Sequence, residues 1–198
     1  MSIETQMTPG QAYVPLRLAG RSLALKALVL ALGVAFLTAS SWVQVPMWPV
    51  PMTMQTFAVL MVGALCGWRL GVATVATWLA LSVAFPLLSE FKTLLMVITT
   101  SGYLAAFVIM AGFVGYMAER GWTARVIPAF LVLLVAEVIC FALGVGYLGS
   151  VIGYDKAVEY GLMPFIVGDL VKTLLAVALL TVLRRMLPAG KAGLDAFN

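Results

Sequence analysis

The sequence has little charge and no histidine. Of its 198 residues only 10% are charged, whereas 63% are hydrophobic, and the mean hydropathy is +1.08. A soluble domain has about 25% charged and about 45–50% apolar residues, so this chain has too little polar surface to fold as a globule in water. The scarcity of charge therefore excludes a soluble enzyme and a disordered protein, and it indicates an integral membrane protein.

The absence of histidine and the scarcity of cysteine limit the chemistry further. Histidine is the commonest general base and metal ligand, and the two cysteines, Cys66 and Cys140, lie apart in apolar stretches. The sequence has no metal-ligand spacing, no catalytic Ser-His arrangement and no G-x-x-x-x-G-K-[ST] loop for ATP. We therefore expect free buried thiols, and neither an enzyme nor a bound metal or cofactor.

Long apolar runs fill most of the chain. They predict membrane-spanning helices at about 22–41, 52–67, 70–88, 93–118, 126–152 and 162–183. Three prolines follow the first run and cannot continue a helix: Pro46, Pro49 and Pro51. The expected fold is an all-α integral membrane protein, a six-transmembrane-helix bundle in residues 22–186 with polar tails at 1–21 and 187–198.

The basic residues are distributed unequally between the two sides of this bundle. Nine lie on one side: Arg17, Arg21, Lys26, Arg69, Arg120, Arg125, Arg184, Arg185 and Lys191. The other side has only Lys92 and Lys156. Because cytoplasmic loops carry the excess of Lys and Arg, both termini are predicted to be cytoplasmic. This topology also explains the net charge of +4, so we expect no nucleic-acid partner.

Three ionisable residues fall within predicted spans, where a charge is costly and often functional: Glu137, Asp169 and Lys172. Asp169 and Lys172 are three residues apart, so they share a helix face and can pair about 10–15 Å below the outer surface. The pair is either part of a ligand site or a structural salt bridge. Glu137 is either a proton or cation site or, as we favour, a protonated carboxyl group hydrogen-bonded to another helix.

Two further patterns have both a structural and a functional interpretation. Aromatic and polar residues near the outer face are typical of the membrane interface, and they could also line a pocket for a flat, mostly apolar ligand: Trp48, Thr53, Gln55, Tyr103, Tyr147 and Phe165. Small residues recur at every fourth position of the first span: Ala27, Ala31, Ala35 and Ala39. Such a stripe packs against a helix of this chain or of a partner.

Glycines of residues 144–149 (GVGYLG) match the dinucleotide fingerprint G-x-G-x-x-G. That fingerprint requires a preceding strand and a βαβ unit, whereas this segment ends a predicted membrane helix. We therefore reject a dinucleotide site.

Two ordered motifs resemble the BioY family. Residues 50–56 (VPMTMQT) resemble its V-P-x-T-x-Q-T signature, and residues 63–71 (GALCGWRLG) fit the G-A-x-x-G-x-x-x-G continuation. Residues 162–172 (LMPFIVGDLVK) resemble the P-F-x-x-G-D-x-x-K signature. Residues 101–104 (SGYL) resemble part of G-G-Y-L-x-G-F, although Ser101 and Ala106 replace its usual glycines, and residues 86–93 lack a glycine-rich run.

The resemblance implies a biotin-binding S component of an energy-coupling-factor (ECF) importer, with six helices in a bacterial cytoplasmic (inner) membrane. It places Asp169 and Lys172 in the biotin site and the segment from Thr53 to Gln55 beside it. It also implies that the alanine stripe contacts the transmembrane T component, with two cytoplasmic ATPases supplying energy. Function without dedicated partners, a homo-oligomer, an S component for another vitamin and a membrane scaffold with a structural Asp–Lys pair stay open as alternatives.

Overall fold

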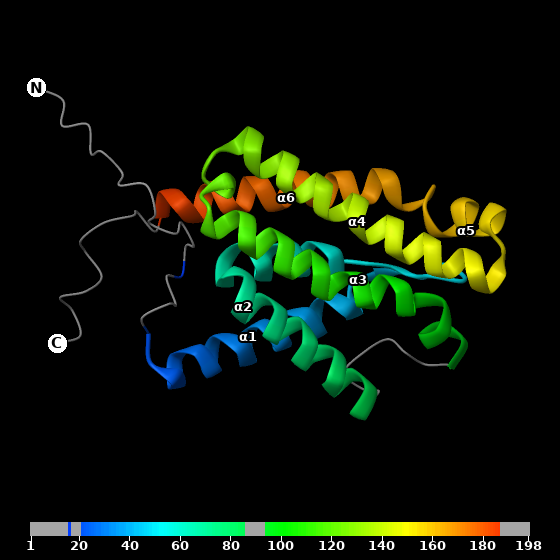
Figure 1. Cartoon of the computed structure of the whole chain (residues 1–198), viewed down its shortest axis with the longest axis horizontal. Coiled ribbons are helices and arrows are strands. Elements are labelled where there is room, and N and C mark those ends of the chain that lie inside the picture. The colour runs from blue at the N-terminus through cyan, green and yellow to red at the C-terminus, as the bar shows by residue number, and fades with distance from the viewer. Residues whose placement is uncertain (1–15, 17–20, 86–93, 187–198) are drawn as a thin grey trace, which may run out of the picture.

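The computed structural model describes residue 16 and residues 21–85 and 94–186. Its helices are α1 (Leu23–Trp42), α2 (Gln55–Ala84), α3 (Leu94–Glu119), the 3-10 turn η3 (Trp122–Ala124), α4 (Val126–Ile152), α5 (Tyr154–Gly161) and α6 (Phe165–Met186) (Figure 1). Two short strands, β1 (Gln44–Val45) and β2 (Met52–Thr53), lie between α1 and α2. Most of the predicted tail 1–21, the tail 187–198, and Arg17, Lys92 and Lys191 lie outside the described residues.

The expected all-helical membrane architecture is confirmed. Five of the described helices are long and apolar enough to cross a membrane: α1, α2, α3, α4 and α6. Their buried faces meet in one apolar core, whose largest fully buried side chains include Trp78, Leu60, Met110 and Leu133. The other faces of these helices expose leucine, isoleucine and valine, as expected for surfaces in contact with lipid.

The predicted spans 52–67 and 70–88 occupy the single element α2, which doubles back at Gly67. This residue has φ 79° and ψ 174°, a conformation outside the helical region. A Cβ atom on Gly71 would lie only 3.3 Å from the Cα of Gly63, although eight residues of straight helix rise by about 12 Å. The two arms of α2 therefore pack against each other close to the turn.

The end of α3 stabilises this turn. The backbone N–H of Trp68 donates to Glu119 Oε1 over 3.1 Å, so a carboxylate accepts from the first free amide of the second arm. Gly115 faces the same turn, and a Cβ atom there would overlap the backbone of Trp68. The positive φ angle thus requires glycine at position 67, and the close approach of the Trp68 backbone requires it at position 115.

The proline-containing segment after α1 forms an antiparallel hairpin instead of a helix. Gln44 pairs with Thr53, and Val45 pairs with Met52. The backbone N–H of Met54 also donates to the carbonyl oxygen of Val43 over 3.0 Å, and α2 begins at Gln55. The hairpin thereby brings the segment from Thr53 to Thr56 over the interior of the bundle.

The two ends of the bundle differ in charge. The start of α1, η3 and the end of α6 lie at one end, and α5 lies at the other (Figure 1). Described basic residues near the first end are Arg21, Lys26, Arg69, Arg120, Arg125, Arg184 and Arg185, whereas α5 carries Lys156. The short helix α5 was not expected as a separate element, and α6 begins at Phe165 instead of residue 162.

Candidate functional site

Asp169 and Lys172 form a buried ion pair on α6. Lys172 Nζ donates to Asp169 Oδ1 over 2.7 Å, and the two residues are 6% and 3% exposed, respectively. They lie four and seven residues after the start of α6, which corresponds to about 6 and about 10 Å of helical rise. The expected depth of about 10–15 Å was counted from residue 162; because α6 begins three residues later, the helical rise to the pair is shorter by about 4.5 Å.

Thr56 of α2 completes a triangle with this pair. Its hydroxyl donates to Asp169 Oδ1 and accepts from Lys172 Nζ, each over 3.2 Å. Both hydrogen bonds of the carboxylate to described residues therefore involve Oδ1, which leaves Oδ2 without a partner among them. Since an ammonium group has three donors, Lys172 keeps one N–H for a further acceptor.

Gln55 and Thr53 add a second polar group at the start of α2. The Thr53 hydroxyl donates to Gln55 Oε1 and accepts from the Gln55 backbone N–H, each over 3.2 Å. Gln55 is only 7% exposed, and its Nε2 is buried without a hydrogen-bond partner among the described residues. A buried unpaired amide is unfavourable, so Nε2 is a donor available to a ligand.

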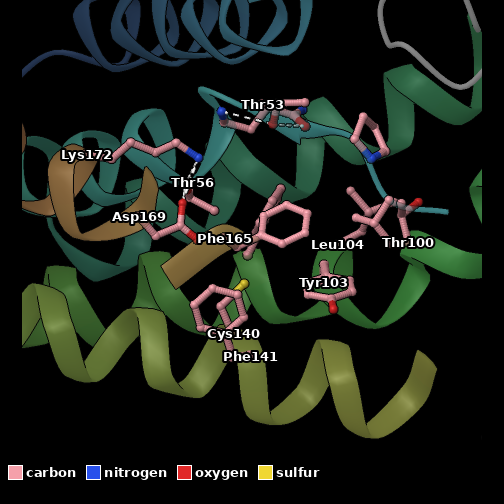
Figure 2. A pocket seen from close by; sticks show the side chains of 14 residues that line it. Thr53, Thr56, Thr100, Tyr103, Leu104, Cys140, Phe141, Phe165, Asp169 and Lys172 are labelled. Carbon is pink, nitrogen blue, oxygen red and sulfur yellow. Dashed lines mark hydrogen bonds and ion pairs between the residues drawn. The ribbon is translucent and has the colours of Figure 1, made fainter. Parts of the chain in front are cut away.

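These polar groups lie on the wall of a mostly apolar cavity (Figure 2). The empty space of the cavity is about 670 Å³, which includes open solvent at its mouth. Its lining residues come from the hairpin segment, α2, α3, α4 and α6: Val50, Pro51, Thr53, Gln55, Thr56, Thr100, Tyr103, Leu104, Phe107, Cys140, Phe141, Phe165, Asp169 and Lys172.

The aromatic side chains form the side of the cavity opposite the hairpin segment. Phe165 and Phe141 pack edge to face, with ring centroids 6.4 Å apart. The Tyr103 hydroxyl donates to the carbonyl oxygen of Gly161 over 2.8 Å, and its ring packs directly on Gly144. Because its hydroxyl is engaged at the end of α5, Tyr103 presents mainly its ring to the cavity.

The close packing at Gly144 also accounts for the G-x-G-x-x-G pattern. A Cβ atom on Gly144 would overlap the ring of Tyr103, and one on Gly149 would overlap the ring of Tyr154. The first and last glycines of the pattern, both on α4, therefore make room for the tyrosine rings of α3 and α5. This helical segment offers no dinucleotide site.

The structure brings together six of the eight residues proposed for the ligand site from the sequence. Asp169, Lys172, Thr53, Gln55, Tyr103 and Phe165 line the cavity. Trp48 and Tyr147 do not line it: Trp48 is 69% exposed, and Tyr147 is 40% exposed and packs against Gly102 on α3.

Sequence reasoning did not select eight of the lining residues. Helical spacing could have found three of them, since Thr100, Leu104 and Phe107 share one face of α3 with Tyr103. Cys140 and Phe141 follow Glu137 by about one turn of α4. Thr56 meets Asp169 across 113 residues of sequence, and no local pattern contains such a contact.

The alanine stripe lies on the exposed side of α1. Ala27, Ala31 and Ala35 are all exposed, and α1 instead approaches α2 through Gly33, where a Cβ atom would overlap the side chain of Thr74. Packing within the described part of the chain therefore does not account for these alanines.

Comparison with known proteins agrees with this geometry. The sequence model of the BioY family matches residues 13–189. The chain belongs to the BioY family. It is 33% identical over 158 residues to a biotin transporter BioY of Thermotoga maritima, with 76% of this chain and 89% of the relative covered. It is 32% identical to a biotin transporter BioY of Rhizobium etli, with 66% and 76% covered.

A solved structure supports the fold of this BioY chain. The crystal structure of an S component for biotin from an ECF-type ABC transporter superimposes with a TM-score of 0.66 at 23% identity. The match covers 84% of this chain and 95% of the other. The BioY chain thus has the S-component fold and is a multi-pass membrane protein of a transporter family, with no enzymatic role.

Proposed function

We propose that this BioY chain captures biotin for uptake across the membrane, as the substrate-binding subunit of an ECF-type importer. The observation that carries the proposal is the buried triangle of Thr56, Asp169 and Lys172 on the wall of a mostly apolar cavity. A small-molecule site is a mostly apolar concavity with a few fixed polar groups, and this cavity has that composition.

The chemistry of biotin fits these groups. Its ureido N–H groups are donors for the free Oδ2 of Asp169, and its ureido carbonyl or its carboxylate is an acceptor for the remaining donors of Lys172 and Gln55. The thioether ring and the valeryl chain are apolar, which suits the rings of Tyr103, Phe141 and Phe165. The ureido end of biotin offers both donors for Asp169 and an acceptor, whereas its carboxylate offers acceptors for Lys172 and Gln55 alone.

The proposed topology has six crossings, both termini in the cytoplasm, and the bacterial cytoplasmic (inner) membrane as its location. The reversal at Gly67 supports it, because each arm of α2 then counts as one crossing. The basic end of the bundle faces the cytoplasm by the positive-inside rule. The cavity lies near the start of α6, at the end of the bundle that carries α5, which is the exterior end in this topology.

The proposed partners are a transmembrane T component and two cytoplasmic ATPases. The exposed Ala27, Ala31 and Ala35 support a contact with a partner helix, because small side chains allow two helices to approach closely. The ATPases would supply the energy, which is consistent with the lack of a G-x-x-x-x-G-K-[ST] loop in this sequence.

Equilibrium binding of labelled biotin to the purified protein tests the proposal. Asp169→Asn should weaken binding about 10- to 150-fold, since a hydrogen bond to a charged group contributes about 1.5–3 kcal/mol. Asp155→Asn is the matched control, because Asp155 is exposed on α5 and does not line the cavity. Unlabelled vitamins other than biotin should not compete.

Two results would contradict the proposal. If the folded wild type binds no biotin, the ligand assignment is wrong. If Asp169→Asn and Asp155→Asn bind biotin as the wild type does, the buried pair is a structural salt bridge and the protein's ligand site lies elsewhere.

A further inference from the structure

Glu137 is a buried carboxyl group that the proposed site does not use. It is 3% exposed near the middle of α4, and neither Oε1 nor Oε2 has a hydrogen-bond partner within the described part of the chain. The hydrogen bond to another helix that we expected from the sequence is therefore not found there. A buried carboxylate without a donor is strongly unfavourable, so this environment favours the protonated, neutral form.

Glu137 does not line the cavity, but Cys140, one turn further along α4, does. Asp169 and Lys172 of α6 and Tyr103 of α3 line the same cavity, and together with Glu137 and Cys140 they form the network of titratable groups at this site. The titratable residues of α5, in contrast, are exposed at the end of the bundle: Tyr154, Asp155, Lys156, Glu159 and Tyr160.

The charges of this network balance only while Glu137 is neutral. Lys172 and Asp169 form a pair without net charge, and ionised Glu137 would add a second carboxylate near a single lysine. The added charge would repel a ligand carboxylate placed near Lys172. If a ureido carbonyl instead accepts from Lys172, the ionised Glu137 would attract the lysine ammonium group away from that carbonyl. Ionisation of Glu137 therefore opposes binding whether the carboxylate or the ureido end of biotin meets Lys172.

We propose that Glu137 is a proton-binding site linked to the ligand site: biotin is bound while Glu137 carries a proton, and loss of that proton weakens binding. The inference rests on the proposed function, because it takes the ligand to be anionic biotin. Between the pH at which Glu137 ionises in the empty protein and the higher pH at which it ionises in the biotin complex, each biotin bound is accompanied by up to one proton taken from solution onto the Glu137 carboxylate.

The pH dependence of biotin affinity tests this inference on the full-length protein between about pH 6 and about pH 10. In the wild type the affinity should fall with rising pH by at most about tenfold per pH unit, as expected for one proton. Glu137→Gln has a permanently neutral side chain of the same shape, so it should keep the low-pH affinity to higher pH. Glu159→Gln, an exposed carboxyl group on α5, is the matched control and should behave as the wild type.

Two outcomes overturn the inference alone: a wild-type affinity that does not change with pH, or a pH profile of Glu137→Gln equal to that of the wild type. Loss of the pH dependence in Cys140→Ala, with retention in Glu137→Gln, would assign the proton to the thiol and also overturn it. A wild type that binds no biotin at any pH overturns the proposed function and this inference together.

If Glu137→Gln does not fold, two measurements on the wild type test the inference instead. Binding at high pH should take up about one proton per biotin by calorimetry in buffers of different ionisation enthalpy. The infrared difference spectrum between the biotin-bound and the empty protein at that pH should show a new carbonyl band from the protonated carboxyl group of Glu137. Absence of either signal overturns the inference.

Discussion

Replacing Thr56 by valine removes one hydroxyl group from the ligand site and keeps its shape. That hydroxyl donates to Asp169 Oδ1 and accepts from Lys172 Nζ, each over 3.2 Å, and so connects α2 to the ion pair of α6. In Thr56→Val the pair retains its own 2.7 Å contact. Asp169 and Lys172 lose the only described hydrogen bonds that fix them relative to α2.

The expected effect is a loss of biotin affinity. A hydrogen bond to a charged group contributes about 1.5–3 kcal/mol, and the intact ion pair should compensate part of the loss of two. We therefore expect about 1.5–3 kcal/mol less binding free energy, which is about a 10- to 150-fold higher Kd. Thr56→Ser retains the hydroxyl and should stay within about threefold of the wild type.

Calorimetric titration with biotin, together with thermal unfolding of each variant, measures this effect. Thr181→Val is the matched control, because the Thr181 hydroxyl donates to the carbonyl oxygen of Val177 on the same helix and Thr181 does not line the cavity. The reasoning is refuted if Thr56→Val binds as tightly as the wild type. It is also refuted if Thr56→Ser is as weak as Thr56→Val, because the hydroxyl would then not be the important group.

Two further predictions concern the turn in α2 and the alanine stripe. Gly67→Ala should lower the unfolding free energy by about 1–3 kcal/mol, because φ 79° and ψ 174° are nearly restricted to glycine and the added Cβ would lie 2.5 Å from Glu119 Oε1. Gly146→Ala, with no atom within 4 Å of the added Cβ, should not destabilise the protein in the same chemical-denaturation assay; equal losses would contradict the reasoning. Ala31→Trp on the exposed side of α1 should abolish uptake of labelled biotin by cells yet leave binding by purified protein within about twofold, since a bulky side chain prevents close helix contact. Loss of binding in that variant would instead indicate internal packing.

The helices of this chain could be predicted well because the signal for each is local. The predicted span 126–152 coincides with α4, and the predicted start of α1 differs from the structure by one residue. The turn at Gly67 was predicted as a gap between two spans. Its sharpness depends on Glu119 and Gly115, which lie about 50 residues later, so the sequence around Gly67 alone does not specify it.

The site was predictable in part for the same reason. Asp169 and Lys172 could be paired from their spacing, because a helix brings residues three apart onto one face. Trp48 and Tyr147 were selected because aromatic residues near a membrane surface suit an apolar ligand, yet both lie outside the cavity lining. Residue type does not reveal how a helix is rotated about its axis. That rotation turns Tyr103 of α3 toward the cavity, whereas Tyr147 of α4 packs against Gly102.

The sequence by itself determined the membrane class of this protein, the order of its apolar helices, the unequal distribution of its basic residues and its resemblance to the BioY family. Each follows from composition, periodicity or contiguous motifs, which are read along the chain. Only the tertiary structure decided that Thr56 meets Asp169 and Lys172, that Cys140 and Phe141 line the cavity, and that Glu137 is buried without a hydrogen-bond partner among the described residues. These contacts join helices far apart in sequence, and their geometry depends on how those helices rotate and cross as they pack.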